Sequence, residues 1–306
     1  MMRASRKYEA YGMQAHLIGA GERLHLQHGP IDMIIDADGH CRNEIFEIAV
    51  QTGLPVLDEL VEELHQLRAP HRKDNDFKGP VARRMQAACD MANGQFVTPM
   101  IAVAGAVADH ILSAILENDA AHTATKISVN NGGDIAFWTA PGAMTTARIA
   151  GIAGGQLMIT GPTMWRGIAT SGWQGRSHSL GVADSVTVLA RNAATADIAA
   201  TLIANAVNPA DATEIIRMPA NSLNPDSDLG DRLVTTGVPL LDKVSVDSAI
   251  RSGAAVAQQM LNKDQIAGAV ISLQGHNDVV GMTADTIGTT RLLPQFESDE
   301  IEEYHA

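Results

Sequence analysis

Two stretches rich in small residues constrain most strongly what this chain can fold into. The segment 98–117 starts with Thr98-Pro99 and consists of alanine, glycine and valine over 102–108, and the segment 193–207 is also rich in alanine. Thr98 suits a helix N-cap and Pro99 suits the first helical position, so a helix is predicted to begin there. Because small side chains let backbones approach closely, we expect both helices to pack tightly against a sheet or against each other.

The other segments alternate between strand and helix patterns. In chain order we expect paired strands over 14–38, helices over 42–68 and from Pro80 to about Asn93, short strands over 124–191, a helix over 245–262 and a strand over 267–273. The strands ending at Asn130 and Ala190 are expected to share one sheet. We therefore predict an α+β fold of mixed sheet layers packed with helices, in a single compact unit over 1–306. Its parts are an N-terminal hairpin region (14–40), a motif-bearing core (95–207) and an acidic tail (295–306).

Charge and composition exclude several classes of protein. The net charge of -13 leaves no basic surface for nucleic acid. Two cysteines, Cys41 and Cys89, are too few for a disulfide framework or a zinc site, and we expect free thiols. The basic N-terminus has no apolar segment after it, and the stretch 100–116, interrupted by Asp109, is judged too short to span a membrane. We expect a soluble cytoplasmic protein without membrane partners, and a homo-oligomer is left open.

The first candidate for chemistry is the run Asn131-Gly132-Gly133-Asp134, which follows an apolar strand. Paired glycines leave backbone N–H groups free to face an anion and let a ligand approach the chain. Asp134 would then present a carboxylate beside the ligand. The alternative is a hairpin turn in which Asn and Asp bind backbone groups, and the sequence alone favours this alternative.

The second candidate is Asp197 with Thr201, four positions apart on a predicted helix. This spacing places both side chains on one face. Carboxylate and hydroxyl oxygens suit Mg²⁺, which takes few protein ligands and keeps waters or phosphate oxygens. The alternative is an ordinary pair of polar residues facing solvent.

The third candidate is a polar stretch that begins with Thr170-Ser171-Gly172. It continues with Arg176, His178 and Asp184. Arg176 has the geometry to bind a phosphate or carboxylate through two nitrogens, and His178 can transfer a proton near neutral pH. A histidine in a loop is more often simply solvated, so His178 and Asp184 are candidates for catalysis only in combination with the other two signals.

Taken in order, these motifs resemble the ApbE (FAD:protein FMN transferase) superfamily. The shared elements, all within 95–207, are Gly132-Gly133-Asp134-Ile135, Thr170-Ser171-Gly172, the loop from His178 to Asp184, the strand Ser185-Val186-Thr187-Val188, and Ala196-Asp197 with Thr201. The helix from Val103 to Asp109 stands where the family has a Lys-Gly-x-x-x-Asp helix, with Ala104 in place of the lysine. The usual His-His-x-x-Asp-Pro loop also lacks its proline here. These departures indicate a divergent, cytoplasmic and largely uncharacterised ApbE-like branch.

The resemblance implies a fold, related to the T-fold, that binds FAD. It implies that Asp197 and Thr201 hold Mg²⁺ together with a backbone carbonyl near Ala104 and Gly105, and that the Gly132-Gly133 turn and the Thr170-Ser171-Gly172 segment line the ligand site. In the family the enzyme breaks the pyrophosphate of FAD and passes FMN to a threonine or serine of a flavoprotein.

Three functions remain open at this stage. The first is a Mg²⁺-dependent flavin transferase, or another enzyme that uses a flavin nucleotide. The second is a hydrolase or lyase acting on a small anionic metabolite in the same cleft, with Arg176, His178 and Asp184. The third is a non-catalytic flavin-binding protein. Aromatic residues make up only 4% of the chain, which argues against stacking of an isoalloxazine ring; Trp165 and Trp173 are the only candidates near the motifs.

Overall fold

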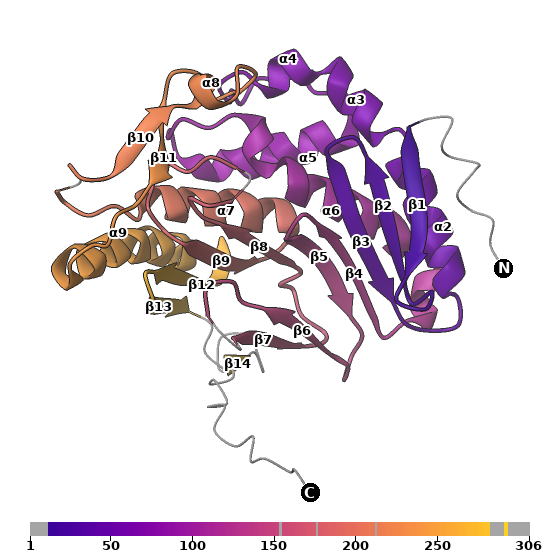
Figure 1. Ribbon diagram of the computed structural model, residues 1–306. Helices are drawn as coiled ribbons and strands as arrows, with labels where there is room; N and C mark the ends of the chain where they lie inside the picture. The colour runs from indigo at the N-terminus through magenta and orange to yellow at the C-terminus, as the bar shows by residue number, and fades with distance from the viewer. Residues whose placement is uncertain (1–11, 153–154, 176, 212, 282–290, 293–306) are drawn as a thin grey trace, which may run out of the picture.

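The computed structural model describes residues 12–152, 155–175, 177–211, 213–281 and 291–292. Arg176 and the acidic tail 295–306 therefore lie outside the described residues. Helices and sheets pack together in layers, as the sequence predicts (Figure 1).

A large antiparallel sheet organises the described part of the chain (Figure 1). Its nine strands run in the order β1-β2-β3-β4-β5-β8-β9-β12-β13, and each neighbouring pair is antiparallel. The strands are β1 (Met13–Ile18), β2 (Arg23–His28), β3 (Ile31–Ala37), β4 (Lys126–Asn131), β5 (Asp134–Thr139), β8 (Gly167–Ser171), β9 (Ser185–Ala190), β12 (Ile266–Leu273) and β13 (His276–Gly281). Strands β4 and β9 thus lie in one sheet, which confirms the expectation for the strands ending at Asn130 and Ala190.

Helices cover one face of this sheet (Figure 1). The helices of the described residues are α2 (Arg42–Gly53), α3 (Val56–Glu62), α4 (Leu64–Leu67), α5 (Pro80–Cys89), α6 (Val103–Leu116), α7 (Ala193–Ala206), α8 (Ala220–Leu223) and α9 (Lys243–Asn262), with short 3₁₀ helices η2 (Asp90–Ala92), η3 (Pro99–Ala102) and η4 (Asp119–Thr123). The helix predicted over 98–117 is divided into η3 and α6, because Ala102 leaves the helical region with a φ of -118°. Cys41 and Cys89 are free thiols, as expected.

A small second sheet lies against the opposite face of the central strands. It contains β14 (Arg291–Leu292), β7 (Gln156–Thr160) and β6 (Met144–Arg148), in that order. Between the two sheets, Phe137, Ile159, Ile168 and Leu189 form a separate apolar cluster. The central strands are therefore buried on both faces, which explains why β9 and β12 are buried along their whole length.

A two-stranded ribbon, β10 (Ile216–Pro219) with β11 (Leu233–Gly237), joins α7 to α9 and carries α8 between its strands. The sequence analysis missed these elements. The strands are short and contain Pro219, and the connection between them is polar, so neither strand shows a sustained period of two. This excursion supplies a loop to the candidate site.

The two helices rich in small residues cross in direct contact, as predicted. A Cβ atom added at Gly105 of α6 would lie 2.3 Å from the carbonyl oxygen of Ala193 at the start of α7. Only glycine permits this approach, because any larger residue would have to displace a backbone. The crossing places the first turn of α6 beside the first turns of α7, and the candidate site grows from this junction.

The segment Pro99–Leu116, which spans η3 and α6, satisfies the criteria of length and composition for a membrane-spanning helix. It has 18 residues and a mean hydropathy of 1.7, so the estimate that this stretch is too short was wrong. In the structure 56% of this window is buried, and α6 packs against α2, α5, α7 and the sheet. Core helices of folded domains also pass such a test.

Candidate functional site

The Gly132-Gly133 pair forms the two-residue turn of a β-hairpin. Asn131 at the end of β4 pairs with Asp134 at the start of β5, and the glycines have φ values of 66° and 114°. The side chain of Asn130 accepts a hydrogen bond from the Gly133 N–H at 2.8 Å. The structure therefore confirms that this run forms a hairpin turn, the alternative that the sequence favoured. A Cβ added at Gly133 would meet no atom within 4 Å, so one side of the turn is open to an incoming group.

Asp197, in the second turn of α7, points at the first turn of α6. Its Oδ2 accepts a hydrogen bond from the Gly105 N–H at 3.2 Å. This N–H is one of the helix-start donors that have no partner within their own helix. Asp197 is half-buried as a residue, and protein atoms surround its carboxyl closely.

The carboxyl of Asp134 is a direct neighbour of the Asp197 carboxyl. Burial, and then the negative charge of Asp134, raise the pKa of Asp197 well above its usual value, and the Gly105 N–H opposes this only in part. Two carboxylates in contact repel each other unless a proton or a cation lies between them. The structure thus brings together two residues that come from separate sequence motifs.

Thr201 follows Asp197 by one turn of α7, and its hydroxyl donates to the Ser171 hydroxyl at 3.4 Å. The predicted shared face of Asp197 and Thr201 is thus present, and it reaches the end of β8. The neighbouring Thr170 hydroxyl pairs at 2.9 Å with Thr187 on β9, so it is engaged within the sheet.

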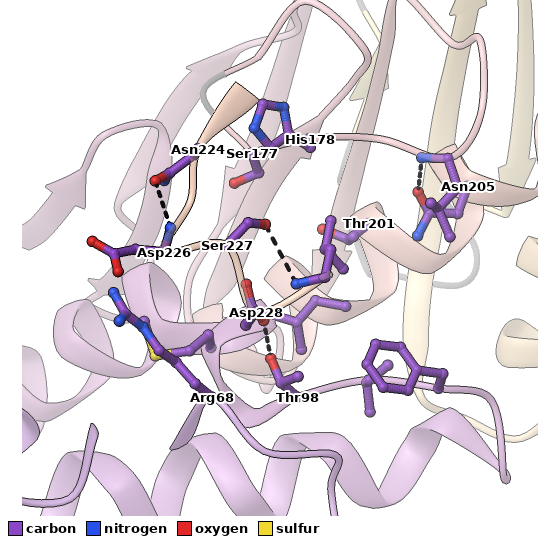
Figure 2. A pocket seen from close by; sticks show the side chains of 16 residues that line it. Arg68, Thr98, Ser177, His178, Thr201, Asn205, Asn224, Asp226, Ser227 and Asp228 are labelled. Carbon is purple, nitrogen blue, oxygen red and sulfur yellow. Dashed lines mark hydrogen bonds between the residues drawn. The ribbon is translucent and has the colours of Figure 1, made fainter. Parts of the chain in front are cut away.

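Thr201 also lines a pocket of about 280 Å³ (Figure 2). His178 and Arg68 line the same pocket, together with the loop 224–229 that precedes β11. The Thr98 hydroxyl donates to the carboxylate of Asp228, which ties this loop to the start of η3 (Figure 2). The pocket therefore combines a hydroxyl, an imidazole and a guanidinium within reach of the Asp197 helix.

Arg68 and the loop 224–229 were missed by the sequence analysis. Arg68 follows α4, about 110 residues before His178 along the chain, and no pattern in the sequence links the two. Asp226 and Asp228 stand two positions apart after Asn224-Pro225, a turn signal that marks a loop but not its location. Only the tertiary fold brings these residues to α7.

Two predicted site residues have mainly structural contacts. Asp184 accepts hydrogen bonds from the Trp173 indole N–H at 3.2 Å and from the backbone N–H of Gln274, and it does not line the pocket with His178. A Cβ added at Gly172 would lie 2.3 Å from the Asp184 carbonyl oxygen, so this glycine permits close packing of the chain. Catalytic or ligand-binding roles for Asp184 and Gly172 stay predictions.

Asp109 interrupts the apolar stretch and stands at the Asp position of the Lys-Gly-x-x-x-Asp helix in the resemblance, but no role was predicted for it; in the structure it links α6 to the start of α7. Its two carboxylate oxygens accept the N–H groups of Ala193 and Ala194, at 2.9 and 2.8 Å, at the start of α7. Burial raises the pKa of Asp109 to about 6, against the effect of these two hydrogen bonds and of the nearby Arg84. Each of the two helices is thus capped by an aspartate of the other.

The donor set around Asp197 fits a hard divalent cation in chemical type. Asp134 and Asp197 supply oxygens with negative charge, and Thr201 supplies a neutral hydroxyl on the same helix. No group of three or more His, Cys, Asp or Glu residues with the geometry of a metal site occurs among the residues that the structure describes. A cation here would therefore depend on water or on ligand oxygens for the rest of its coordination.

The order of the motifs on this sheet-and-helix scaffold defines an ApbE-like protein. More specifically, the family model described as AbpE bacteria matches residues 15–279, and the chain belongs to that family.

Curated relatives carry the name UPF0280 protein, which assigns no activity. The chain is 34% identical over 179 residues to the one from Methanothrix thermoacetophila, covering 54% of this chain and 70% of that relative. It is 35% identical over 147 residues to the one from Methanocaldococcus jannaschii, covering 44% of this chain and 54% of that relative. Matches of this kind thus leave up to about half of a relative's length uncovered.

Among solved structures, a mutant of the flavin transferase ApbE from Vibrio cholerae aligns over 87% of this chain and 99% of its own, with a TM-score of 0.43 and 12% identity. The apo flavinyl transferase ApbE from Pseudomonas stutzeri aligns over 84% and 93%, with a TM-score of 0.38 and 13% identity. Likeness this low does not define a site, so the function is argued from the residues of this chain.

Proposed function

We propose that this chain is a flavin-nucleotide transferase that works with a divalent cation, such as Mg²⁺. The contact between the Asp134 and Asp197 carboxyls, beside the open side of the Gly132-Gly133 turn, carries the proposal. Two half-buried carboxyls in contact are costly for the fold, and the pair has a use where a cation bound to a phosphate compensates the charge. The resemblance of the motifs to the ApbE superfamily, with which the family match agrees, suggests FAD as the nucleotide.

In this proposal each element of the site has a separate task. Asp134 and Asp197 would hold the cation, with the Thr201 hydroxyl as a neutral ligand. Such a cation, when bound, would neutralise charge on the pyrophosphate of the substrate. The open turn at Gly133 would let the pyrophosphate approach the backbone.

The pocket beside Thr201 would receive the acceptor hydroxyl. In the transfer, a bond forms between the hydroxyl oxygen and the phosphorus of the FMN half, the pyrophosphate P–O bond breaks, and AMP leaves. The hydroxyl proton needs a base, and the His178 imidazole lines this pocket. Arg68, which also lines the pocket, could bind an anionic group.

The test uses the purified protein with FAD and an acceptor peptide that carries threonine and serine hydroxyls, with and without Mg²⁺. We expect AMP to be released only when the cation is present, and Gly133→Val to abolish flavin binding while the protein stays folded by circular dichroism. A valine side chain would occupy the open side of the turn and disfavour positive φ. Normal flavin binding in Gly133→Val would show that the glycine pair is only a turn and not part of the ligand site. Absence of AMP under all conditions would contradict the proposed transferase function.

A hydrolase or lyase acting on a small anionic metabolite is the second candidate. The observation that favours it is the pocket itself, which at about 280 Å³ suits a small metabolite and combines Arg68 with His178. This function predicts that FAD releases no AMP. It also predicts that Gly133→Val leaves metabolite binding unchanged, whereas Arg68→Ala abolishes it.

A further inference from the structure

One peptide group at the start of α6 is held from both sides. The carbonyl oxygen of Ala104 accepts a hydrogen bond from Asn131 Nδ2 at 3.1 Å, and the N–H of Gly105 donates to Asp197 Oδ2 at 3.2 Å. Both groups belong to the planar peptide that joins Ala104 to Gly105. A chain of two hydrogen bonds therefore runs from β4, through the first turn of α6, to the carboxyl on α7.

The orientation of the Asn131 amide follows from its other partner. Asn131 Oδ1 accepts the backbone N–H of Asp32 at 3.3 Å, and the side chain is only 6% exposed. Because the oxygen of the amide faces a donor, its nitrogen must face the Ala104 carbonyl, which is an acceptor. The Asn131 side chain is thus committed at both ends to protein groups.

This chain of hydrogen bonds acts on the orientation of Asp197. A donor on the carbonyl side polarises a peptide and strengthens the N–H on its other side. The Asp197 carboxyl needs such a restraint, since its neighbour Asp134 would otherwise repel it when both are ionised. The Gly105 N–H holds Oδ2 of Asp197 in place beside the Asp134 carboxyl.

We propose that Asn131 is a positioning residue that fixes the Asp197 carboxylate through the Ala104–Gly105 peptide. For its effect on cation binding and catalysis this inference rests on the proposed function. It differs from the sequence-based expectations, which gave Asn131 to the ligand and the carbonyl near Ala104 to the metal. In the structure the Asn131 amide engages that carbonyl.

The experiment compares two variants of the whole protein. Asn131→Ala removes both hydrogen bonds of the amide, whereas Asn131→Asp keeps an acceptor for the Asp32 N–H but removes the donor to Ala104. Both variants should speed hydrogen exchange of the Gly105 amide, followed by NMR in protein labelled with ¹⁵N-glycine. Both should also weaken Mg²⁺ binding, measured by calorimetry with FAD present, by about tenfold, the usual scale for residues that orient metal ligands.

Asn118→Ala is the matched control, because it also removes an asparagine that accepts a backbone N–H, that of Ala120 at 2.9 Å, but on η4. It should change neither Gly105 exchange nor Mg²⁺ affinity, even where it lowers the unfolding midpoint as much as the Asn131 variants do. Unchanged Gly105 exchange in both Asn131 variants would overturn the proposal. So would faster exchange with unchanged Mg²⁺ affinity, since Asn131 would then support only the helix.

Failure of the proposed function gives a different result. If the wild-type protein bound no divalent cation and released no AMP, the transferase would be excluded. The Gly105 amide would still decide whether Asn131 holds Asp197 through the peptide, because that exchange rate is measured without metal or flavin.

Discussion

Asp109 and Asp197 occupy equivalent places at the two ends of one helix crossing, yet their surroundings differ. Asp109 of α6 accepts two N–H groups at the start of α7, one on each oxygen. Asp197 of α7 accepts one N–H at the start of α6, and it meets the carboxyl of Asp134. A carboxylate with both oxygens bonded to backbone completes the fold, whereas one that faces a second carboxyl needs a proton or a cation. The comparison separates a structural aspartate from a functional one within a single junction.

The largest effect is expected from a change that disturbs both ends of the crossing at once. Gly105→Ala would place a Cβ 2.3 Å from the Ala193 carbonyl oxygen and 2.7 Å from the Ala194 nitrogen. The helices would have to separate, which would strain the hydrogen bonds of both aspartates. We expect a loss of roughly 3 kcal/mol in the free energy of unfolding, measured with urea. Alanine normally stabilises a helix relative to glycine, so any gain in stability would show that the helices do not meet as closely as described.

The second prediction concerns the structural carboxyl, through its dependence on pH. Burial raises the pKa of Asp109 to about 6 from its usual 3.8, so the folded state binds the proton more tightly than the unfolded state does. The proton on Asp109 makes its full contribution to the free energy of unfolding below about pH 4, and this contribution is lost as the pH rises through 6. The difference corresponds to up to about 3 kcal/mol.

Asp109→Asn carries no titrating proton and provides the comparison for that measurement. The wild-type protein should lose stability relative to Asp109→Asn between pH 4 and pH 6.5, in denaturation curves recorded at several pH values. A constant difference between the two proteins over that range would mean that the two helix-start N–H groups keep the Asp109 carboxylate charged.

The third prediction separates the two aspartates by the sign of the effect. Asp197→Asn keeps an acceptor for the Gly105 N–H, removes the repulsion with Asp134, and adds an N–H that can donate to it. We expect the free energy of unfolding at pH 7.5, without divalent cations, to rise by about 1 kcal/mol. Mg²⁺ affinity with FAD present should fall by at least about tenfold, near 1.4 kcal/mol.

Asp109→Asn is the matched control for this experiment, and it should leave Mg²⁺ affinity within about twofold of the wild type, which is less than 0.5 kcal/mol. Equal Mg²⁺ affinity in the wild-type protein and in Asp197→Asn would show that the cation does not bind at Asp197.

The sequence predicted the parts of the site that depend on local spacing. The interval between Asp197 and Thr201 fixes a shared helix face, and the two glycines fix a turn, so both could be recognised without a structure. The structural role of Asp109 could not be predicted from the sequence, because its partners are backbone N–H groups about 84 residues later in the chain. The same limit applies to Arg68, which reaches the pocket only through the packing of α4.

The smallest effect is expected from Thr201, the neutral member of the functional end. Thr201→Val keeps the shape of the side chain and removes a hydroxyl whose hydrogen bond to Ser171 is long, at 3.4 Å. Stability should therefore change by less than about 1 kcal/mol. A hydroxyl contributes less than a carboxylate to a hard cation, so Mg²⁺ affinity with FAD present should fall by about threefold, less than in Asp197→Asn. Thr187→Val, which removes a hydroxyl engaged with Thr170 inside the sheet, should leave that affinity unchanged. A larger loss in Thr201→Val than in Asp197→Asn would move the cation from the carboxyl pair towards the pocket, and the contrast between the two aspartates would then no longer define the site.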